Sequence, residues 1–287
     1  MSDIVDVAGF YDGIPDHVYH SDKGSLSSSG ARKLLPPSAP AIFRYERDHP
    51  PAPTKAFDLG HAAHTLVLGE GGELRMIPEE ILSSNGAATT KAAKEFVDQA
   101  HADGAVPLKP DEYQQVHEMA AAVRTNPYAA ALLATGVPER SLWWQDPATG
   151  VWLRARPDWT TAGADGRPIL VDYKTSTSAN PDDFRSSAAK YGYHQQAPFY
   201  LDGMSALGVH DCGFLFIVQD KTPPYLVSVV ELTADAMLAG RDLNRRAIDI
   251  YAECMATDTW PAFGDGIHLI DLPKWAYYQA EEILRVR

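Results

Sequence analysis

The sequence is poor in cysteine and has no long apolar run. Its 287 residues include two cysteines, Cys212 and Cys254, which are too few for a four-thiolate zinc site or an iron–sulfur cluster. No apolar run approaches the about 18 residues that a membrane-spanning helix needs, so we expect no membrane span. The opening "MSDIVDVAGFYDG" is acidic and lacks a charged-then-apolar leader, so we expect no signal peptide and a cytoplasmic location.

Basic residues are also scarce relative to acidic ones. Lys and Arg number 25 against 38 Asp and Glu, which gives a net charge of −13. This balance argues against a protein whose whole surface is basic for binding nucleic acid. It does not exclude a basic groove or a central channel. Acidic residues at a metal site are in any case neutralised by the ions that they hold.

The remaining composition is that of an ordinary globular protein, with 45% hydrophobic and 22% charged residues. We predict one domain over residues 1–287. It would comprise a mostly helical N-terminal elaboration (1–135), a core (136–256) and a C-terminal extension (257–287). Helices come first, followed by three strands, a helix, two strands and a helix. This order predicts an α/β (α+β mixed) fold, with a mixed central sheet flanked by helices.

Caps and hydrophobic spacing predict the helices. Ser27 to Ser29 are capping candidates for a short first helix. Apolar residues recur at helical spacing in "KAFDLGHAAHTLVL" (residues 55–68). Two Ala-rich helices are predicted over residues 88–103 and 110–135. Asn180 and Thr233 are typical N-cap residues for two later helices, the second over 233–255.

The strands are predicted from runs of apolar and β-branched residues. "RSLWWQD" and "VWLRARPDW" read as a hairpin around a Pro-Ala-Thr-Gly turn. "PILVDYKTST" follows as a further strand after a Gly/Asp-rich turn, and "CGFLFIVQDKTPPYLVSVVEL" gives two more strands around a Pro-Pro turn.

Two carboxylates and an amine are the most informative side chains. Alternation along a strand puts Asp172 and Lys174 on one face, and a hairpin would bring Asp158 beside Asp172. Adjacent carboxylates repel unless a cation lies between them, and such hard oxygen ligands suit Mg²⁺ or Mn²⁺. Lys174 would then lie where it could orient or deprotonate a water molecule. An Asp-x-Lys strand is otherwise an ordinary solvated face with an ion pair.

Three further patterns accompany this set. Gly60 to His64 form a Gly-x-x-x-His pattern on a predicted helix, although His61 lies on the same helix. Glu139 precedes the first strand of the core. Gln196 and Tyr200 are four residues apart on a predicted helix and therefore share a face. Pro198 between them predicts either a late helix start or a kink, and Gln195 is an alternative to Gln196.

Taken in order, these motifs resemble the PD-(D/E)xK nuclease superfamily. The N-terminal "LSSSGARKLLPPSAPAIFRYER" is also similar to the opening of the exodeoxyribonuclease VIII-like, phage-type exonuclease branch. The resemblance spans nearly the whole chain and implies a restriction-endonuclease-like core with an N-terminal helical elaboration.

The resemblance also implies roles. His64, Asp158, Asp172 and the backbone carbonyl of Tyr173 would hold Mg²⁺, with Mn²⁺ able to substitute and with neither ATP nor an iron–sulfur cluster. Lys174 would act on the nucleophilic water. Glu139 would be an outer acid. Gln196 and Tyr200 would position the metal shell, the lysine or a phosphate.

The activity implied is 5′ to 3′ hydrolysis of linear double-stranded DNA in phage-type recombination. A ring-shaped homo-oligomer and a single-strand annealing protein would be partners. Arg154 and Arg156 share a strand face and would either contact phosphates or be solvated. Other readings stay open: an endonuclease or another nuclease subtype, a DNA-binding protein without catalysis, or a metal hydrolase with another substrate.

Overall fold

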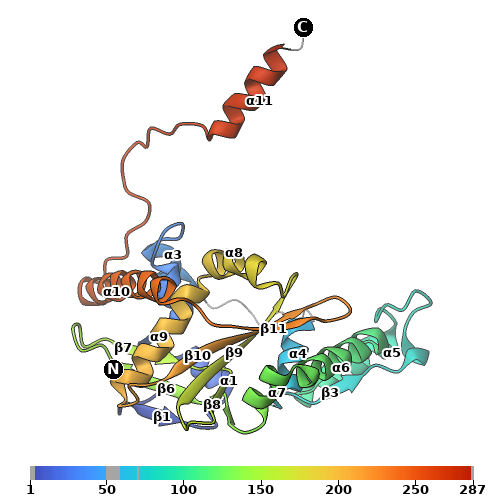
Figure 1. The fold of residues 1–287 in the computed structure, drawn as a ribbon. Coiled ribbons are helices and arrows are strands. Elements are labelled where there is room, and N and C mark those ends of the chain that lie inside the picture. Colours follow the sequence, from blue (N-terminus) through green and yellow to red (C-terminus); the bar gives the residue numbers. More distant parts are fainter. Residues whose placement is uncertain (1–3, 50–58, 70, 286–287) are drawn as a thin grey trace.

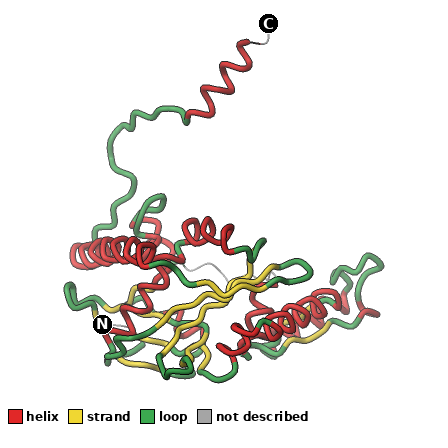
Figure 2. Tube along the Cα trace, viewed as in Figure 1, coloured by secondary structure: helices red, strands yellow, loops and turns green. Residues whose placement is uncertain are grey.

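The computed structural model describes residues 4–49, 59–69 and 71–285. Strands gather at the centre of the molecule, and helices lie on either side of them (Figure 1). The tube trace in Figure 2 shows the same separation of strands and helices. The predicted mixed α/β class is therefore confirmed. Within these ranges, no helix combines the length and apolarity needed to cross a bilayer.

The described strands form two main sheets and one small pair. One sheet has the order β1-β6-β7-β2 and another has the order β11-β10-β9-β8-β5. The pair β3-β4 is parallel. The bounds are β1 Gly9–Tyr11, β2 Ser25–Ser27, β3 Leu74–Met76, β4 Val106–Leu108, β5 Val137–Pro138, β6 Ser141–Gln145, β7 Trp152–Ala155, β8 Trp159–Ala162, β9 Pro168–Ser176, β10 Gly213–Asp220 and β11 Val227–Val230.

The helices include most of those that the caps and spacing predict. Their bounds are α1 Asp16–Ser21, α2 Ser28–Lys33, α3 Pro40–Asp48, α4 Leu59–Leu68, η1 Glu79–Ile81, α5 Lys91–Ala102, α6 Pro110–Thr125, α7 Pro127–Leu133, α8 Pro181–Tyr191, α9 Tyr193–Ala206, α10 Ala234–Thr257 and α11 Lys274–Arg285. The Ser27, Asn180 and Thr233 side chains cap α2, α8 and α10, as predicted. Residues 55–58 of one predicted helix lie outside the described residues.

Two sequence predictions are wrong in detail. The helix over 110–135 is divided, because the Asn126 side chain caps a new helix that has Pro127 in its first turn. The strand through "VWLRARPDW" is also divided: β7 ends at Ala155 and β8 starts at Trp159, in the other sheet. Pro157 cannot donate a ladder hydrogen bond, which favours such a break. The chain therefore changes sheets immediately before Asp158.

The parallel pair β9–β10 is covered on both faces. Leu170 and Phe216 belong to a buried apolar cluster with residues of α2, α9 and α10. Val171 and Ile217, which alternate with them, pack in a second cluster with residues of α4 and α6. Alternation along a strand thus sends successive side chains to opposite cores. Asp172 is two residues after Leu170, so its side chain lies on the same face of β9, toward α9.

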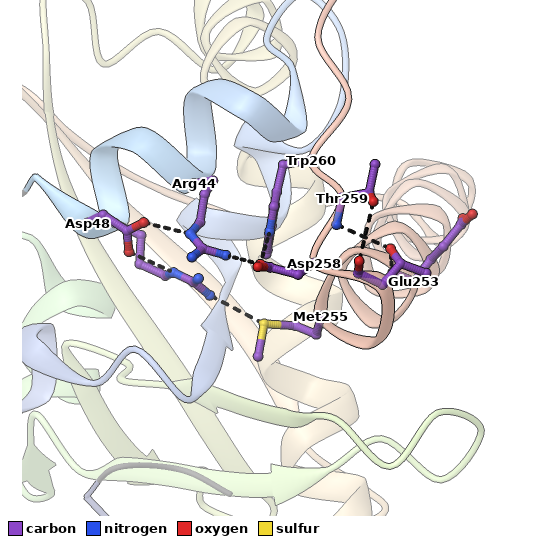
Figure 3. A network of polar contacts seen from close by, with 9 residues as sticks. Arg44, Asp48, Glu253, Met255, Asp258, Thr259 and Trp260 are labelled. Atoms are coloured by element: carbon purple, nitrogen blue, oxygen red, sulfur yellow. Dashed lines mark hydrogen bonds and ion pairs between the residues drawn. The ribbon is translucent and has the colours of Figure 1, made fainter.

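The start of the C-terminal extension is anchored on α3. Arg44 donates to Asp48 Oδ2 at 2.6 Å and to Asp258 Oδ1 at 2.7 Å (Figure 3). The Trp260 ring stacks on the Phe43 ring with 5.7 Å between centroids. Beyond this anchor the chain leads to α11, which projects away from the body (Figure 1) and has no buried residue.

Candidate active site

The turn into β8 and the strand β9 bring the predicted carboxylates and lysine together. Trp159 pairs with Val171 in the antiparallel β8–β9 ladder, so Asp158 comes level with Asp172. The Tyr173 backbone N–H donates to Asp158 Oδ2 at 2.8 Å. Lys174 forms a close ion pair with Asp172 Oδ2. Asp172 is 1% exposed, so this carboxylate has almost no contact with solvent.

Helix α9 supplies the next group. Gln196 Nε2 donates to Asp172 Oδ1 at 2.5 Å, and Tyr200 lines the same cavity one turn further on. Gln195 is not among the residues lining that cavity, and its backbone carbonyl instead accepts a hydrogen bond from Asn244 Nδ2 at 2.8 Å. The structure thus brings Gln196, rather than its alternative, to the carboxylates.

Pro198 lies inside α9 without ending it. Proline has no N–H, so the helix loses the hydrogen bond that the His194 carbonyl would accept. Gly240 of α10 packs directly against that carbonyl: a Cβ at this glycine would lie 1.7 Å from the His194 oxygen. Because α9 continues through the proline, Gln196 and Tyr200 both reach the cavity.

Helix α4 places an imidazole on the other side of Asp158. His64 Nε2 lies 3.3 Å from Asp158 Oδ2. Burial opposes protonation of His64, but its hydrogen bond to Asp158 and the nearby acids outweigh this, and its pKa is raised. The side chain of His61 lies outside the described part of the chain.

Glu139 reaches the cavity from an unusual backbone conformation. Its φ of 44° lies in the left-handed region, which costs a non-glycine residue about 1 kcal/mol or more. Its N–H donates to the Asp158 carbonyl at 3.1 Å. Its carboxylate lies 3.9 Å from Arg156 Nη1, so Glu139 is at the edge of the cluster rather than between the two aspartates.

The two arginines predicted to face DNA or solvent are both buried. Arg154 is 7% exposed and donates to Ser25 Oγ at 2.8 Å. Arg156 is 9% exposed and donates to Ser141 Oγ at 2.8 Å. The solvated alternative is therefore wrong for both. Arg156 lines the cavity, whereas Arg154 does not.

Charge is unevenly balanced within the cluster. Burial, followed by the negative charge of Asp158, raises the pKa of Asp172 to about 6. Burial also acts on Asp158, but the His64 hydrogen bond and charge prevail and lower its pKa. For Lys174, burial is outweighed by Asp172 and Asp158, and its pKa is raised. The ammonium is therefore protonated at neutral pH and donates rather than accepts.

A cavity of about 730 Å³, which we call the main cavity, is lined by His64, Asp158, Lys174, Gln196 and Tyr200, and the buried Asp172 lies behind its wall. The wall also includes residues that the sequence did not single out as functional, from α1, α2 and α9: Asp16, Tyr19, His20, Ser28, Arg32 and Tyr193. The serine run was predicted only as a cap. No local pattern marked the other five, because they meet the carboxylates through contacts between distant segments.

The donors around the main cavity fit a hard divalent cation. Within the described ranges, no three His, Cys, Asp or Glu side chains already converge as a metal site. However, Asp172 Oδ2 is buried with the Lys174 ammonium as its ion-pair partner, and burial, followed by the negative charge of Asp158, raises the Asp172 pKa. Two carboxylates beside an imidazole can hold Mg²⁺ or Mn²⁺, which would favour the ionised form of Asp172.

Comparisons with known proteins agree with this geometry. The crystal structure of a protein from Eubacterium rectale, described as a putative exonuclease, has a similar fold: the TM-score is 0.59, the identity 12%, and the match covers 93% of this chain and 98% of the other. A structure of SSO0001 matches with a TM-score of 0.34 and 13% identity over 79% and 77% of the chains, which is too weak to support an argument. No curated protein matches this chain.

The family comparison covers most of the sequence. Residues 27–273 match the family described as "PDDEXK-like domain of unknown function (DUF3799)". This range contains all the residues predicted for the site, from His64 to Tyr200, and excludes α11. The predicted PD-(D/E)xK resemblance is thereby confirmed at the level of the superfamily. The chain belongs to the DUF3799 family of PDDEXK-like domains.

Proposed function

We propose that this protein is a metal-dependent exonuclease that hydrolyses phosphodiester bonds of linear double-stranded DNA. The supporting observation is the pair of neighbouring carboxylates, Asp158 and the buried Asp172, with Lys174 in ion-pair contact with Asp172. Burial and the charge of Asp158 raise the pKa of Asp172 to about 6. Strongly perturbed acids in a cleft favour a catalytic role over a structural one. The similar protein from Eubacterium rectale supports the fold, and its description as an exonuclease motivates the choice within nucleases.

Asp158 and Asp172 would hold Mg²⁺ or Mn²⁺, with His64 and the Tyr173 carbonyl as further ligands and Glu139 as an outer acid. The bound ion would supply an activated water and stabilise charge on the phosphate oxygens. His64 is in ion-pair contact with Asp158. To ligate, it would have to release its proton, so binding would release protons to the buffer.

The chain's own residues then have separate tasks. The protonated Lys174 would orient the attacking water and donate to a phosphate oxygen. Gln196 would fix Asp172 by donating to Oδ1, while Lys174 is the ion-pair partner of Oδ2. Burial raises the pKa of Tyr200 well above its ordinary value, so its hydroxyl would remain a hydrogen-bond donor to phosphate. Arg156 lines the main cavity, with the Asp16 and Glu139 carboxylates near its Nη1, and would contact DNA there. Arg154, which does not line the main cavity, would support Arg156 from the side away from the cavity.

The finer assignments rest on the sequence resemblance to the exodeoxyribonuclease VIII-like branch. They are 5′ to 3′ polarity, independence from ATP, a ring-shaped homo-oligomer, a single-strand annealing partner in phage-type recombination and a cytoplasmic location. A single nuclease domain with an acidic outside and a more basic interior would reconcile DNA binding with the net charge of −13.

The test compares linear duplex DNA with covalently closed circular duplex DNA, each in Mg²⁺ and in EDTA. We expect the wild-type protein to degrade linear duplex in Mg²⁺, to leave covalently closed circular duplex intact, and to be inactive in EDTA. Duplexes labelled at either end report the polarity. Degradation of the circle as well would favour an endonuclease, and binding without cleavage of any DNA would favour a non-catalytic DNA-binding protein.

The residues are tested by Asp172→Ala and Lys174→Ala, which should reduce the cleavage rate by about 10²-fold to 10⁴-fold, the usual contribution of such groups. Lys94→Ala, an exposed lysine of α5, is the matched control and should cleave at the wild-type rate. Either site variant cleaving linear duplex at the wild-type rate, with an unchanged melting temperature, would contradict the assignment.

A further inference from the structure

A smaller cavity of about 260 Å³ adjoins the main cavity, and we call it the side cavity. It lies between the end of β9, the helix α8 and the start of the β10–β11 connection. Lys174, Thr175 and Tyr193 line both cavities. The two spaces are therefore neighbours that share one wall, which contains the lysine of the cluster.

The side cavity differs from the main cavity in charge. Lys221 and Lys174 line it, and no Asp or Glu is among the described residues of its wall. The main cavity has charges of both signs in its wall: Asp16, Glu139 and Asp158 against Arg32, Arg156 and Lys174. The chain has a net charge of −13, whereas the described wall of the side cavity has two lysines and no acid and is therefore locally positive.

Hydroxyl groups complete the wall of the side cavity. Those of Thr175, Thr177 and Ser187 have no hydrogen-bond partner among the described residues, and Lys221 forms no ion pair with a described carboxylate. Ammonium groups and hydroxyls are the donors that bind phosphate oxygens in proteins. Unlike Lys174, which is paired with Asp172, the Lys221 ammonium is available for such a ligand.

We propose that the side cavity binds a phosphate group of the DNA strand, next to the phosphate that is cleaved in the main cavity. This inference rests on the proposed nuclease function. A strand whose scissile phosphate lies at Asp172 and Lys174 carries its next phosphate one nucleotide away. Because Lys174, Thr175 and Tyr193 line both cavities, the side cavity, with Lys221 and Ser187 in its wall, adjoins the space in which that neighbour would lie. The ligand is either an internal phosphodiester or a terminal phosphate.

Binding is measured by fluorescence anisotropy in the Asp172→Asn background, so that cleavage does not interfere. Two duplexes of identical sequence are used, one with a 5′-phosphate and one with a 5′-hydroxyl. We expect Lys221→Ala to weaken binding roughly tenfold, as for loss of a charge-assisted hydrogen bond. The slope of log affinity against log salt should become shallower by about 0.7 to 0.9, the value for one phosphate contact.

A second variant avoids dependence on the folding of Lys221→Ala. Ser187→Glu introduces negative charge into the side cavity, and we expect it to weaken binding at least as much. Ser186→Glu adds the same charge to the neighbouring exposed position of α8, which does not line the cavity, and should bind as the parent does. Lys221→Arg should retain most of the affinity.

The two duplexes identify the source of the phosphate. An equal loss with both ends indicates an internal phosphodiester, and a loss confined to the 5′-phosphorylated duplex indicates the terminal phosphate. Parent-like affinity and salt slope in both Lys221→Ala and Ser187→Glu would overturn the proposal. That result, obtained while wild-type protein still cleaves DNA, would leave the nuclease function intact. Absence of cleavage and of DNA binding in the wild type would instead refute the function itself.

Discussion

Two buried aspartates in this protein, Asp22 and Asp172, have very different surroundings. Asp22 has a fully buried side chain that accepts hydrogen bonds from Trp143 Nε1 at 2.8 Å, Ser25 Oγ at 2.6 Å and the Gly24 N–H at 2.9 Å. Arg154 lies 3.9 Å away. We call these residues the Asp22 cluster. Its charge is balanced, and its acceptors are used within the fold.

Asp172 is equally buried, but its environment is not balanced. It has Gln196 on Oδ1 and Lys174 on Oδ2 as partners, but burial and a second carboxylate, Asp158, still raise its pKa to about 6. The partners of Asp22 named above include no carboxylate, whereas two adjacent buried carboxylates favour a bound cation. We therefore assign Asp22 a role in stabilising the fold and Asp172 a role in the proposed active site.

The strongest test of this comparison is Asp22→Ala. Removing the carboxylate leaves the Trp143 N–H without its acceptor and the buried Arg154 guanidinium without the charge of Asp22 beside it. Breaking a buried ion pair in this way typically costs about 3–5 kcal/mol, so we expect the free energy of unfolding in urea to fall by that amount. Cleavage of linear duplex should persist below the lowered melting temperature, because Asp22 does not line the main cavity.

Asp12→Ala is the matched control for a surface pair. Asp12 accepts two hydrogen bonds from Arg140, at 2.8 and 3.0 Å, but both side chains are substantially exposed. Exposed pairs contribute about 1 kcal/mol or less. If Asp22→Ala destabilised the protein no more than Asp12→Ala does, burial of the Asp22 cluster would not have the structural importance assigned to it.

The second test uses pH and metal on Asp172. With a pKa of about 6 in the folded state and about 4 when unfolded, this acid keeps its proton longer in the folded protein. The metal-free protein should therefore lose stability as pH rises from about 4 to above 6, by up to about 3 kcal/mol. Mg²⁺ binds the ionised carboxylate, so its stabilising effect should be large at pH 8 and small at pH 5.

Melting temperatures in EDTA and in Mg²⁺ across this pH range measure both effects. Asp172→Asn has no titrating group at this position, so its melting temperature in EDTA should fall less between pH 5 and pH 8 than that of the wild type. A wild-type protein that gained as much from Mg²⁺ at pH 5 as at pH 8 would show that Asp172 is not part of the metal site.

Local signals were sufficient for much of the fold. Caps at Asn180 and Thr233 and the alternation in β9 depend on neighbours in sequence, and the structure has them as predicted. The division at Asn126 was also readable, since Asn followed by Pro is a helix start. The predicted continuous helix gave too much weight to alanine spacing.

Pairing between distant segments was not readable. The strands β1 and β2 have three residues each and join β6 and β7 from more than one hundred residues away in sequence. Tyr19 packs in an apolar cluster with Trp143 and Trp152, and Leu26 in one with Leu142 and Leu153. No local pattern reveals these contacts. The same reason explains the main cavity: the acids and lysine follow from strand alternation, whereas Ser28 and Arg32 enter by tertiary contact.

The smallest and most discriminating test removes one donor from each aspartate. Ser25→Ala deletes a hydrogen bond to Asp22, and we expect a loss of about 1–2 kcal/mol in unfolding free energy, with an unchanged pH dependence of cleavage. Gln196→Ala deletes the donor to Asp172, whose hydrogen bond lowers that pKa. The pH at which Mg²⁺ stabilises half-maximally should therefore rise, because more alkaline solution is needed to ionise Asp172. Were Ser25→Ala to shift this midpoint as well, the two clusters would be coupled and their separation into architecture and chemistry would fail.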